Sequence, residues 1–230
     1  EDLDNFIKEI QISGHPCIQL NLNDTYDLSG EFYLWQFATV VAGSFLGIQP
    51  FDQPNVQQAK DGTEKILLEY ERTGSFKPFP DSKIPGSLLT GPHSDTYLTI
   101  MAFVPQNHEN DHAFHQIRRD ILEQYQITTT FGYGPRFLHS TGQLHKGGPN
   151  NGRFLQVVTD YENDFPIPEK PYTFGRLVSA QAEADLVALK TLGRSVVRVH
   201  VRNNILSELQ NFLSPKLNES ENKPYSIDKN

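Results

Sequence analysis

The 230-residue sequence has little cysteine and few basic side chains. Its single cysteine, Cys17, cannot form an internal disulfide, which fits a reducing cytoplasm. Lys and Arg number 20 against 28 Asp and Glu, which gives a formal net charge of −8. An acidic surface repels polyanions, so we expect neither nucleic acid nor an acidic membrane as a partner. No apolar run approaches the roughly 20 residues that a membrane-spanning helix needs.

The composition is typical of a globular domain rather than a disordered chain. Hydrophobic residues make up 37% of the sequence and charged residues 21%, a balance that can fill a buried core. The sequence opens at Glu1, and its only methionine is Met101. We therefore expect it to have been cut from a longer polypeptide.

Hydrophobic periodicity predicts alternating helices and strands. Apolar side chains recur at helical spacing in 1–12, 31–46, 54–70, 110–125, 173–192 and 205–213. Strand-like runs occupy 17–22, 96–104, 127–131, 153–159 and 195–201. The helix at 31–46 is apolar on nearly every face, so we expect it to be buried. Strands separated by helices of this length indicate βαβ units, which predicts an α/β fold with a mainly parallel sheet.

Prolines and glycines predict where the chain divides. The segment 74–95 contains four prolines and three glycines, which favours an irregular connector. We expect this connector to join a first unit at 1–73 to a second α/β unit at 96–213. The polar residues 214–230 are expected to form a mobile tail.

The first candidate site lies in a turn bracketed by prolines. The turn delivers Gln53 to the start of a helix, and Lys60 follows seven residues later, about two turns on and so on the same face. One amide and one ammonium can then address the same ligand. In the alternative interpretation, Asp52 caps the helix and Lys60 is an ordinary solvated lysine.

The second candidate site is a glycine-rich loop at 130–149. The loop follows a strand and opens a short helix near His139, which is where an open α/β sheet places its ligands. Donors for an anionic, hydroxylated molecule crowd this loop, namely Arg136, His139, Ser140, Thr141, Gln143, His145 and Lys146. Alternatively, the glycines only turn the chain and the histidine packs in the core.

A stripe of histidines offers a third possibility. His108, His112 and His115 are spaced to share one face of a helix, and such a face can hold zinc or nickel. Their neighbours are polar and no cysteine joins them, so solvated histidines are the favoured interpretation and we predict no metal.

Two motifs carry a resemblance to a known family. The segment Gly47 to Lys60 resembles the carboxyl-terminal signature of glucose-6-phosphate isomerases, which it matches at Phe51, Asp52, Gln53, Val56 and Lys60. The family usually has Glu where this chain has Gln57. The run Leu138-His139-Ser140-x-Gly142-Gln143 is similar to a bacterial motif of the same family.

The order of the two motifs indicates which members of the family this chain resembles. In an ordinary isomerase the histidine motif precedes the lysine signature, whereas here it follows. The arrangement therefore resembles the carboxyl-terminal portion of bacterial bifunctional transaldolase/glucose-6-phosphate isomerases, between about Pro16 and Val201. This resemblance implies a three-layer sugar-isomerase sandwich and a cytoplasmic enzyme of glycolysis and gluconeogenesis. It also implies a homo-oligomer, or a partner in the rest of the parent polypeptide, and no cofactor.

The resemblance implies roles for single residues in converting glucose 6-phosphate to fructose 6-phosphate. His139 would open the sugar ring, and Lys60 would stabilise negative charge at the ring oxygen or on the enediolate. Substrate-binding residues would be Gln53, Ser140, Thr141, Gln143, Lys146 and Arg136.

The family's proton-shuttling glutamate has no match in this chain. Its expected position falls near Arg118, and the nearest carboxylate, Glu123, lacks matching neighbours. We therefore expect this base, and the phosphate-binding loop, on polypeptide outside this chain, which would then be inactive alone. A non-catalytic module that binds sugar phosphate or forms dimers is the alternative.

Overall fold

The structure is a computed structural model that describes residues 2–52, 54–75, 88–89 and 95–213. The chain divides into two compact units, Glu1–Asp52 and Gln53–Asn230. We expected the division at 74–95, but it falls after Asp52 because the helix that begins at Pro54 packs within the second unit. Gln53, most of the predicted connector and the predicted tail at 214–230 lie outside the described residues.

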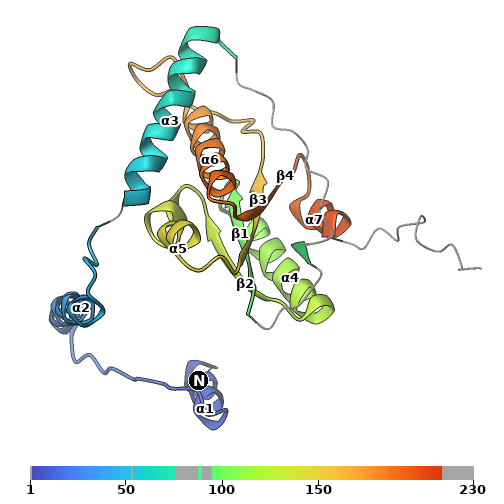
Figure 1. Cartoon of the computed structure of the whole chain (residues 1–230). Coiled ribbons are helices and arrows are strands. Elements are labelled where there is room, and N and C mark those ends of the chain that lie inside the picture. The colour runs from blue at the N-terminus through green and yellow to red at the C-terminus, as the bar shows by residue number, and fades with distance from the viewer. Residues whose placement is uncertain (1, 53, 76–87, 90–94, 214–230) are drawn as a thin grey trace, which may run out of the picture. The chain divides into compact units, whose positions relative to one another are not determined.

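The first unit contains two helices, α1 (Asp2–Ile12) and α2 (Thr25–Leu46), as Figure 1 shows. Asp24 caps α2 by accepting hydrogen bonds from the N–H groups of Tyr26 and Asp27, and Gly47 ends it at a positive φ of 66°. The predicted strand at 17–22 is wrong, because this segment has no regular structure. An alternating pattern forms a strand only beside a partner, and the described part of this unit offers none.

The expectation that the apolar helix is buried does not hold within the first unit. Gly43 is the one buried residue of α2, while Phe32, Trp35 and Phe45 are 61%, 55% and 89% exposed. Helix α1 and a loop are too small to cover α2, which is apolar on every face.

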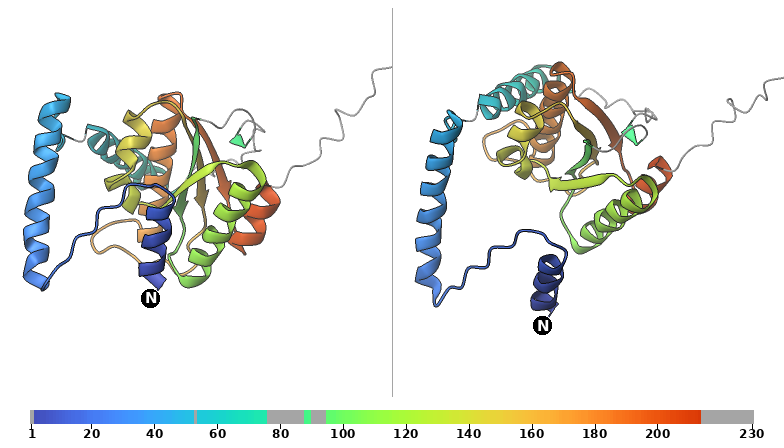
Figure 2. Two further views of the ribbon diagram at one scale, coloured as in Figure 1. Left: turned by 90° about the horizontal axis from the view of Figure 1, so that it is seen from below. Right: turned by 60° about the horizontal axis from the view of Figure 1, so that its bottom comes forward.

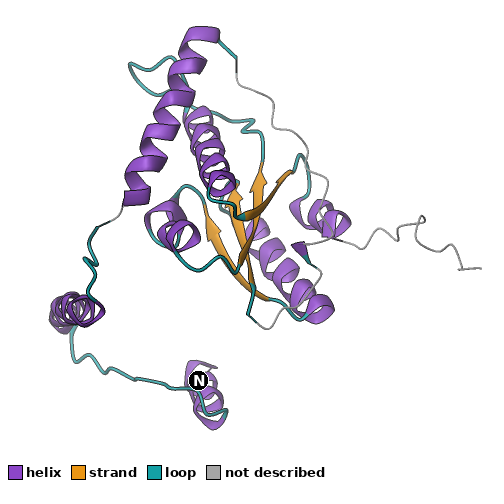
Figure 3. Ribbon diagram, in the orientation of Figure 1, coloured by secondary structure: helices purple, strands orange, loops and turns teal. Residues whose placement is uncertain are grey.

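The second unit is an α/β sandwich around one sheet. Its elements are α3 (Pro54–Thr73), β1 (Tyr97–Phe103), α4 (His108–Tyr125), β2 (Thr128–Tyr133), η2 (Arg136–His139), α5 (Gly142–Gly147), β3 (Gly152–Val158), α6 (Phe174–Thr191), β4 (Ser195–His200) and α7 (Ile205–Leu213). The strands pair in the order β2-β1-β3-β4, and every pairing is parallel. Figure 3 shows the four strands between helices on both faces. The predicted α/β class, the parallel sheet and the three layers are confirmed.

Helices cover both faces of the sheet, and β1 contributes to both cores. Leu98 and Ile100 point toward α4 and α7, whereas Met101 and Phe103 pack on the side of α6. This alternation is the period of a β-strand, and burial on both faces is typical of a central parallel strand. The views in Figure 2 agree that α4 and α7 lie on one side and that α3, α5 and α6 lie on the other.

Helix α3 belongs to the layer that covers the sheet through α6. A Cβ on Gly62 would lie 3.3 Å from the Ala184 Cβ of α6, so the two helix backbones approach closely. The Arg176 guanidinium of α6 lies 5.9 Å from the centre of the Tyr70 ring of α3. The two helices run antiparallel, because Gly62 lies beside Ala184 whereas the later residue Tyr70 lies beside the earlier residue Arg176. Among the described residues, no helix combines the length and hydrophobicity needed to cross a bilayer.

Candidate functional site

Lys60 and His139 line the same pocket in the second unit. The pocket has a volume of about 500 Å³ and lies between α3, η2, α6 and the loop before α6. Its lining consists of Val56, Ala59, Lys60, Thr63, Glu64, Leu67, Leu68, Glu71, Leu138, His139, Lys170, Tyr172 and Gln181. The structure thus brings together the two residues that the sequence motifs singled out, although they come from distant parts of the chain.

Helix α3 supplies one wall of this pocket. Lys60, Glu64, Leu67 and Glu71 recur at the spacing of a single helix face, so all four meet the same space. Leu67 is buried at the base of this stripe, while the three charged side chains are exposed. The Thr63 hydroxyl donates to the Ala59 carbonyl at 2.8 Å, which satisfies a polar group on the buried side of α3.

The end of β2 positions His139. A Cβ on Gly134 would collide with the Phe103 ring, so this turn requires a glycine to pass close to the core. Phe137 then anchors η2 in the core, with its ring 5.5 Å from that of Phe103 in an edge-to-face arrangement. His139 follows two residues later and is exposed at the pocket.

The loop between β3 and α6 forms the third side of the pocket and contributes Lys170 and Tyr172. Thr173 fixes the end of this loop, since its side chain accepts from the Arg176 N–H as the N-cap of α6 and also donates to Asp164. The N–H of Lys170 donates to the carbonyl of Ile167 at 3.1 Å.

The functional side chains of the pocket are not engaged with one another. Within the described part of the chain, Lys60, Glu64 and His139 have no side-chain hydrogen bond or ion pair, and neither has the ammonium of Lys170. The pocket therefore offers two ammonium groups, an imidazole and two carboxylates to a ligand. Sequence reasoning missed Glu64, although its spacing from Lys60 by one helical turn was a usable signal.

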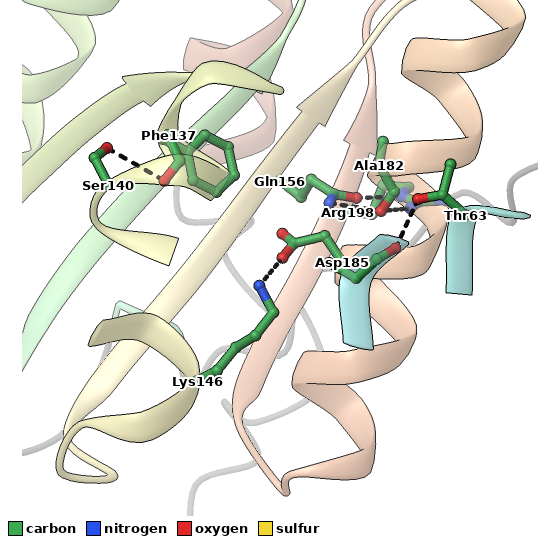
Figure 4. A network of polar contacts seen from close by, with 9 residues as sticks. Thr63, Phe137, Ser140, Lys146, Gln156, Ala182, Asp185 and Arg198 are labelled. Carbon is green, nitrogen blue, oxygen red and sulfur yellow. Dashed lines mark hydrogen bonds and ion pairs between the residues drawn. The ribbon is translucent and has the colours of Figure 1, made fainter. Parts of the chain in front are cut away.

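Lys146 is not a substrate-binding residue in this structure, contrary to our expectation. It is 4% exposed, and its ammonium lies 2.5 Å from Oδ1 of Asp185, as Figure 4 shows. Burial raises the pKa of Asp185, and the neighbouring Lys146 ammonium opposes that shift. The lysine is buried in this ion pair and does not line the pocket.

Four other predicted substrate-binding residues, all within the described part of the chain, lie outside the pocket lining. Arg136 donates to the Gln106 side chain at 2.9 Å, and the Ser140 hydroxyl donates to the Phe137 carbonyl at 3.3 Å. Thr141 is exposed and Gln143 half-buried, and neither lines the pocket. Gln53 lies outside the described residues, so its predicted role remains a prediction.

The two histidines of the glycine-rich loop have opposite environments. His145 is 3% exposed and packs between the rings of Phe137 and Phe154, with centroid distances of 5.6 and 5.2 Å. Burial, and then the nearby Lys146 ammonium, lower the pKa of His145 to about 4. The core-histidine interpretation therefore applies to His145, whereas His139 faces the pocket.

A larger pocket of about 800 Å³ lies on the other side of α3, and Gln57, Asp61, Lys65 and Glu183 are among its lining residues. Gln57 occupies the position where the isomerase signature usually has Glu, and its side chain donates to Asp61 at 2.7 Å. This departure from the family pattern therefore does not alter the pocket that contains Lys60.

The described residues contain no group of three or more His, Cys, Asp or Glu side chains that could hold a metal ion. The stripe of His108, His112 and His115 on α4 thus gains no support as a metal site.

No family model matches the chain, and no curated protein matches it. Among solved structures, the chain is similar to a hypothetical protein from Thermus thermophilus, with 20% sequence identity and a TM-score of 0.43. The similarity covers 52% of this chain and 34% of that one, so the aligned region spans about a third of the other protein.

We predict that Lys146→Met destabilises the protein by about 3–5 kcal/mol, because it leaves the buried Asp185 carboxylate without its partner. The double variant Lys146→Met/Asp185→Leu should recover most of that loss, since it removes both charges. Urea unfolding of the three proteins measures the effect. Equal destabilisation of the single and double variants would contradict the prediction.

We also predict a pH dependence that originates from His145. Its pKa of about 4 in the folded protein lies below the unfolded value near 6.5, so the unfolded chain takes up the proton first as pH falls. The free energy of unfolding should fall by up to about 3 kcal/mol from this group between pH 6.5 and 4. Urea unfolding across this range should show a shallower decline for His145→Asn, and an unchanged decline would disprove the assignment.

Proposed function

We propose that this chain carries part of the site of an aldose–ketose isomerase that interconverts glucose 6-phosphate and fructose 6-phosphate. The observation that carries the proposal is the shared pocket of Lys60 and His139, the two residues to which the resembling motifs attach catalytic roles. Its volume of about 500 Å³ lies within the range of pockets that bind small molecules.

The chemistry of the pocket suits the steps of the reaction. Opening a sugar ring requires a proton to pass to and from the ring oxygen, and an exposed imidazole such as that of His139 can carry it. Converting the open chain requires an enediolate intermediate, whose negative charge an ammonium such as Lys60 can stabilise. No cofactor is needed, because acid–base groups suffice.

Lys170 is the group that we assign to the phosphate. Because α6 runs antiparallel to α3, the loop before α6 reaches the pocket beside the later turns of α3, away from Lys60. The ammonium of Lys170 has no ion pair among the described residues, so it is available to an anion. If the phosphate binds at this end, the reacting carbons of the sugar lie near Lys60 and His139.

We predict that the chain binds fructose 6-phosphate and that Lys60→Ala weakens this binding or the reaction that follows. In a longer polypeptide that contains the complete site, Lys60→Ala and His139→Ala should each lower the isomerisation rate by about 100-fold, measured with a coupled assay for glucose 6-phosphate. Lys65→Ala is the matched control, because this lysine lies on the same helix but lines the other pocket. Absence of fructose 6-phosphate binding in calorimetry would refute the proposed function.

A dimerisation module is the second candidate function, and the surface of α2 favours it. Within the first unit this helix exposes large apolar side chains along its whole length, including those of Leu34 and Phe45. Exposed apolar surface of this extent is typical of an interface with another protein. This role is compatible with the enzyme proposal, since an isomerase can be an oligomer.

If α2 joins two copies of the chain, sedimentation velocity should detect a dimer that Leu34→Asp converts to a monomer. A charge placed in an apolar interface loses hydration without a partner, which costs several kcal/mol. The control is Lys8→Asp on α1, at an exposed polar position. A wild-type monomer at all concentrations would exclude this candidate.

A further inference from the structure

The side chain of Gln181 lines the candidate pocket from α6 and carries the one amide of the described lining. It is half-buried, and its amide makes no hydrogen bond within the described part of the chain. An amide offers one acceptor and two donors, so it can bind hydroxyl groups, which both donate and accept. Neither sequence motif includes Gln181, and the proposed function leaves it without a role.

The packing of α6 on α3 fixes the position of Gln181 along the pocket. Ala184 lies beside Gly62, and the two helices run antiparallel. Gln181 comes three residues before Ala184, so it lies at the level of a residue three places after Gly62. This level is about 7.5 Å beyond Lys60 along the helix axis and about 10 Å from Phe174, where α6 begins. Gln181 therefore lies in the middle part of the pocket.

A sugar phosphate that spans the pocket presents hydroxyl groups at this level. The proposed function places the phosphate, which is bonded to C6, at Lys170, and it places the reacting carbons C1 and C2 near Lys60. The carbons C3 and C4, each with one hydroxyl group, then lie between these two ends and beside Gln181. The inference that follows rests on the proposed function.

The neighbouring side chains of the pocket cannot do what this amide can do. Thr63 is buried, and its hydroxyl donates to the Ala59 carbonyl at 2.8 Å, so its proton is already used. Leu67 is buried and apolar. The carboxylate of Glu64 accepts hydrogen bonds but has none to donate. The amide of Gln181 does both at adjacent atoms, which suits two adjacent hydroxyl groups.

We propose that Gln181 binds the hydroxyl groups at C3 and C4 of the sugar and thereby determines which sugar phosphate the site accepts. The amide oxygen accepts a hydrogen bond from one hydroxyl, and the amide N–H donates to the other. Tagatose 6-phosphate is the C4 epimer of fructose 6-phosphate, so its C4 hydroxyl points to the other side of the carbon chain. The epimer leaves half of the amide unpaired, and the site prefers fructose 6-phosphate for that reason.

The inference is tested by calorimetry of the 230-residue chain with each of the two sugar phosphates. The wild type should bind fructose 6-phosphate about tenfold more tightly than tagatose 6-phosphate. Gln181→Met keeps the length of the side chain but removes its hydrogen-bonding groups, so it should weaken the binding of fructose 6-phosphate by about tenfold. The binding of tagatose 6-phosphate should weaken by about threefold at most, which lowers the preference between the two sugars to about threefold or less.

Gln58→Met is the matched control, since it makes the same chemical change at an exposed residue of α3 that lines the other pocket. It should keep both affinities within about twofold of the wild type. Gln181→Ala is a second variant, which adds no side-chain atoms to the helix layer, and it should lower the preference as Gln181→Met does. A role of Gln181 in folding alone would weaken the binding of both sugars to the same degree and leave their ratio unchanged.

Three results would overturn the assignment, and each differs from failure of the proposed function. They are a wild type that binds tagatose 6-phosphate as tightly as fructose 6-phosphate or more tightly, a Gln181→Met variant with unchanged affinity for fructose 6-phosphate, and an equal loss of affinity for both sugars in that variant. In all three, fructose 6-phosphate still binds to the wild type. A wild-type chain that does not bind fructose 6-phosphate refutes the proposed function itself, and the role of Gln181 falls with it.

Discussion

The buried ion pair between Lys146 and Asp185 joins α5 to α6. Lys146 lies on α5, directly after the segment that presents His139, and Asp185 lies on α6. The neighbour of Asp185, Ala184, is the residue against which Gly62 of α3 packs. Helix α6 is thus the common support for the histidine on one side and for the Lys60 stripe on the other.

This support rests on close packing as well as on charge. The helix presents alanines toward its surroundings, and Ala180, Ala182 and Ala188 are buried along with Ala184. Small side chains allow α3 to approach closely on one side and the sheet on the other. The Lys146 and Asp185 charges can be buried in this layer because they form an ion pair, whereas either charge alone would be costly.

Local pattern was sufficient to predict the main helices and strands of the second unit, although not where the unit begins. The buried run at β1 and the helical spacing of α4 and α6 are repeated over enough residues to fix the type of each element, and helices between strands favour parallel pairing. The same reasoning failed at 17–22, because alternation of apolar and polar residues describes a single strand and does not show whether a second strand is present to pair with it. It also failed for Lys146, since the only feature that distinguishes a buried lysine from a ligand-binding one is Asp185, far along the chain.

The candidate site could likewise be predicted in part from the sequence. Lys60 and His139 stand in short motifs, and Glu64 can be reached from Lys60 by counting one helical turn. Lys170 and Tyr172 could not be found in this way, because their place beside α3 depends on how the loop after β3 folds back before α6. Loop position is set by tertiary contacts such as the bond from Thr173 to Asp164, which no local pattern encodes.

The charges of the pocket constrain how a sugar phosphate can be recognised. Lys60 and Lys170 are balanced by Glu64 and Glu71, so with His139 neutral the pocket has no net charge to attract an anion. Recognition of the sugar phosphate must then depend on the position of each charged side chain within the pocket. All of these side chains are exposed, and water weakens their interactions. The buried Leu67 and the half-buried Leu138 provide an apolar surface beside them, so a bound sugar would displace water and strengthen the charges at the moment of reaction.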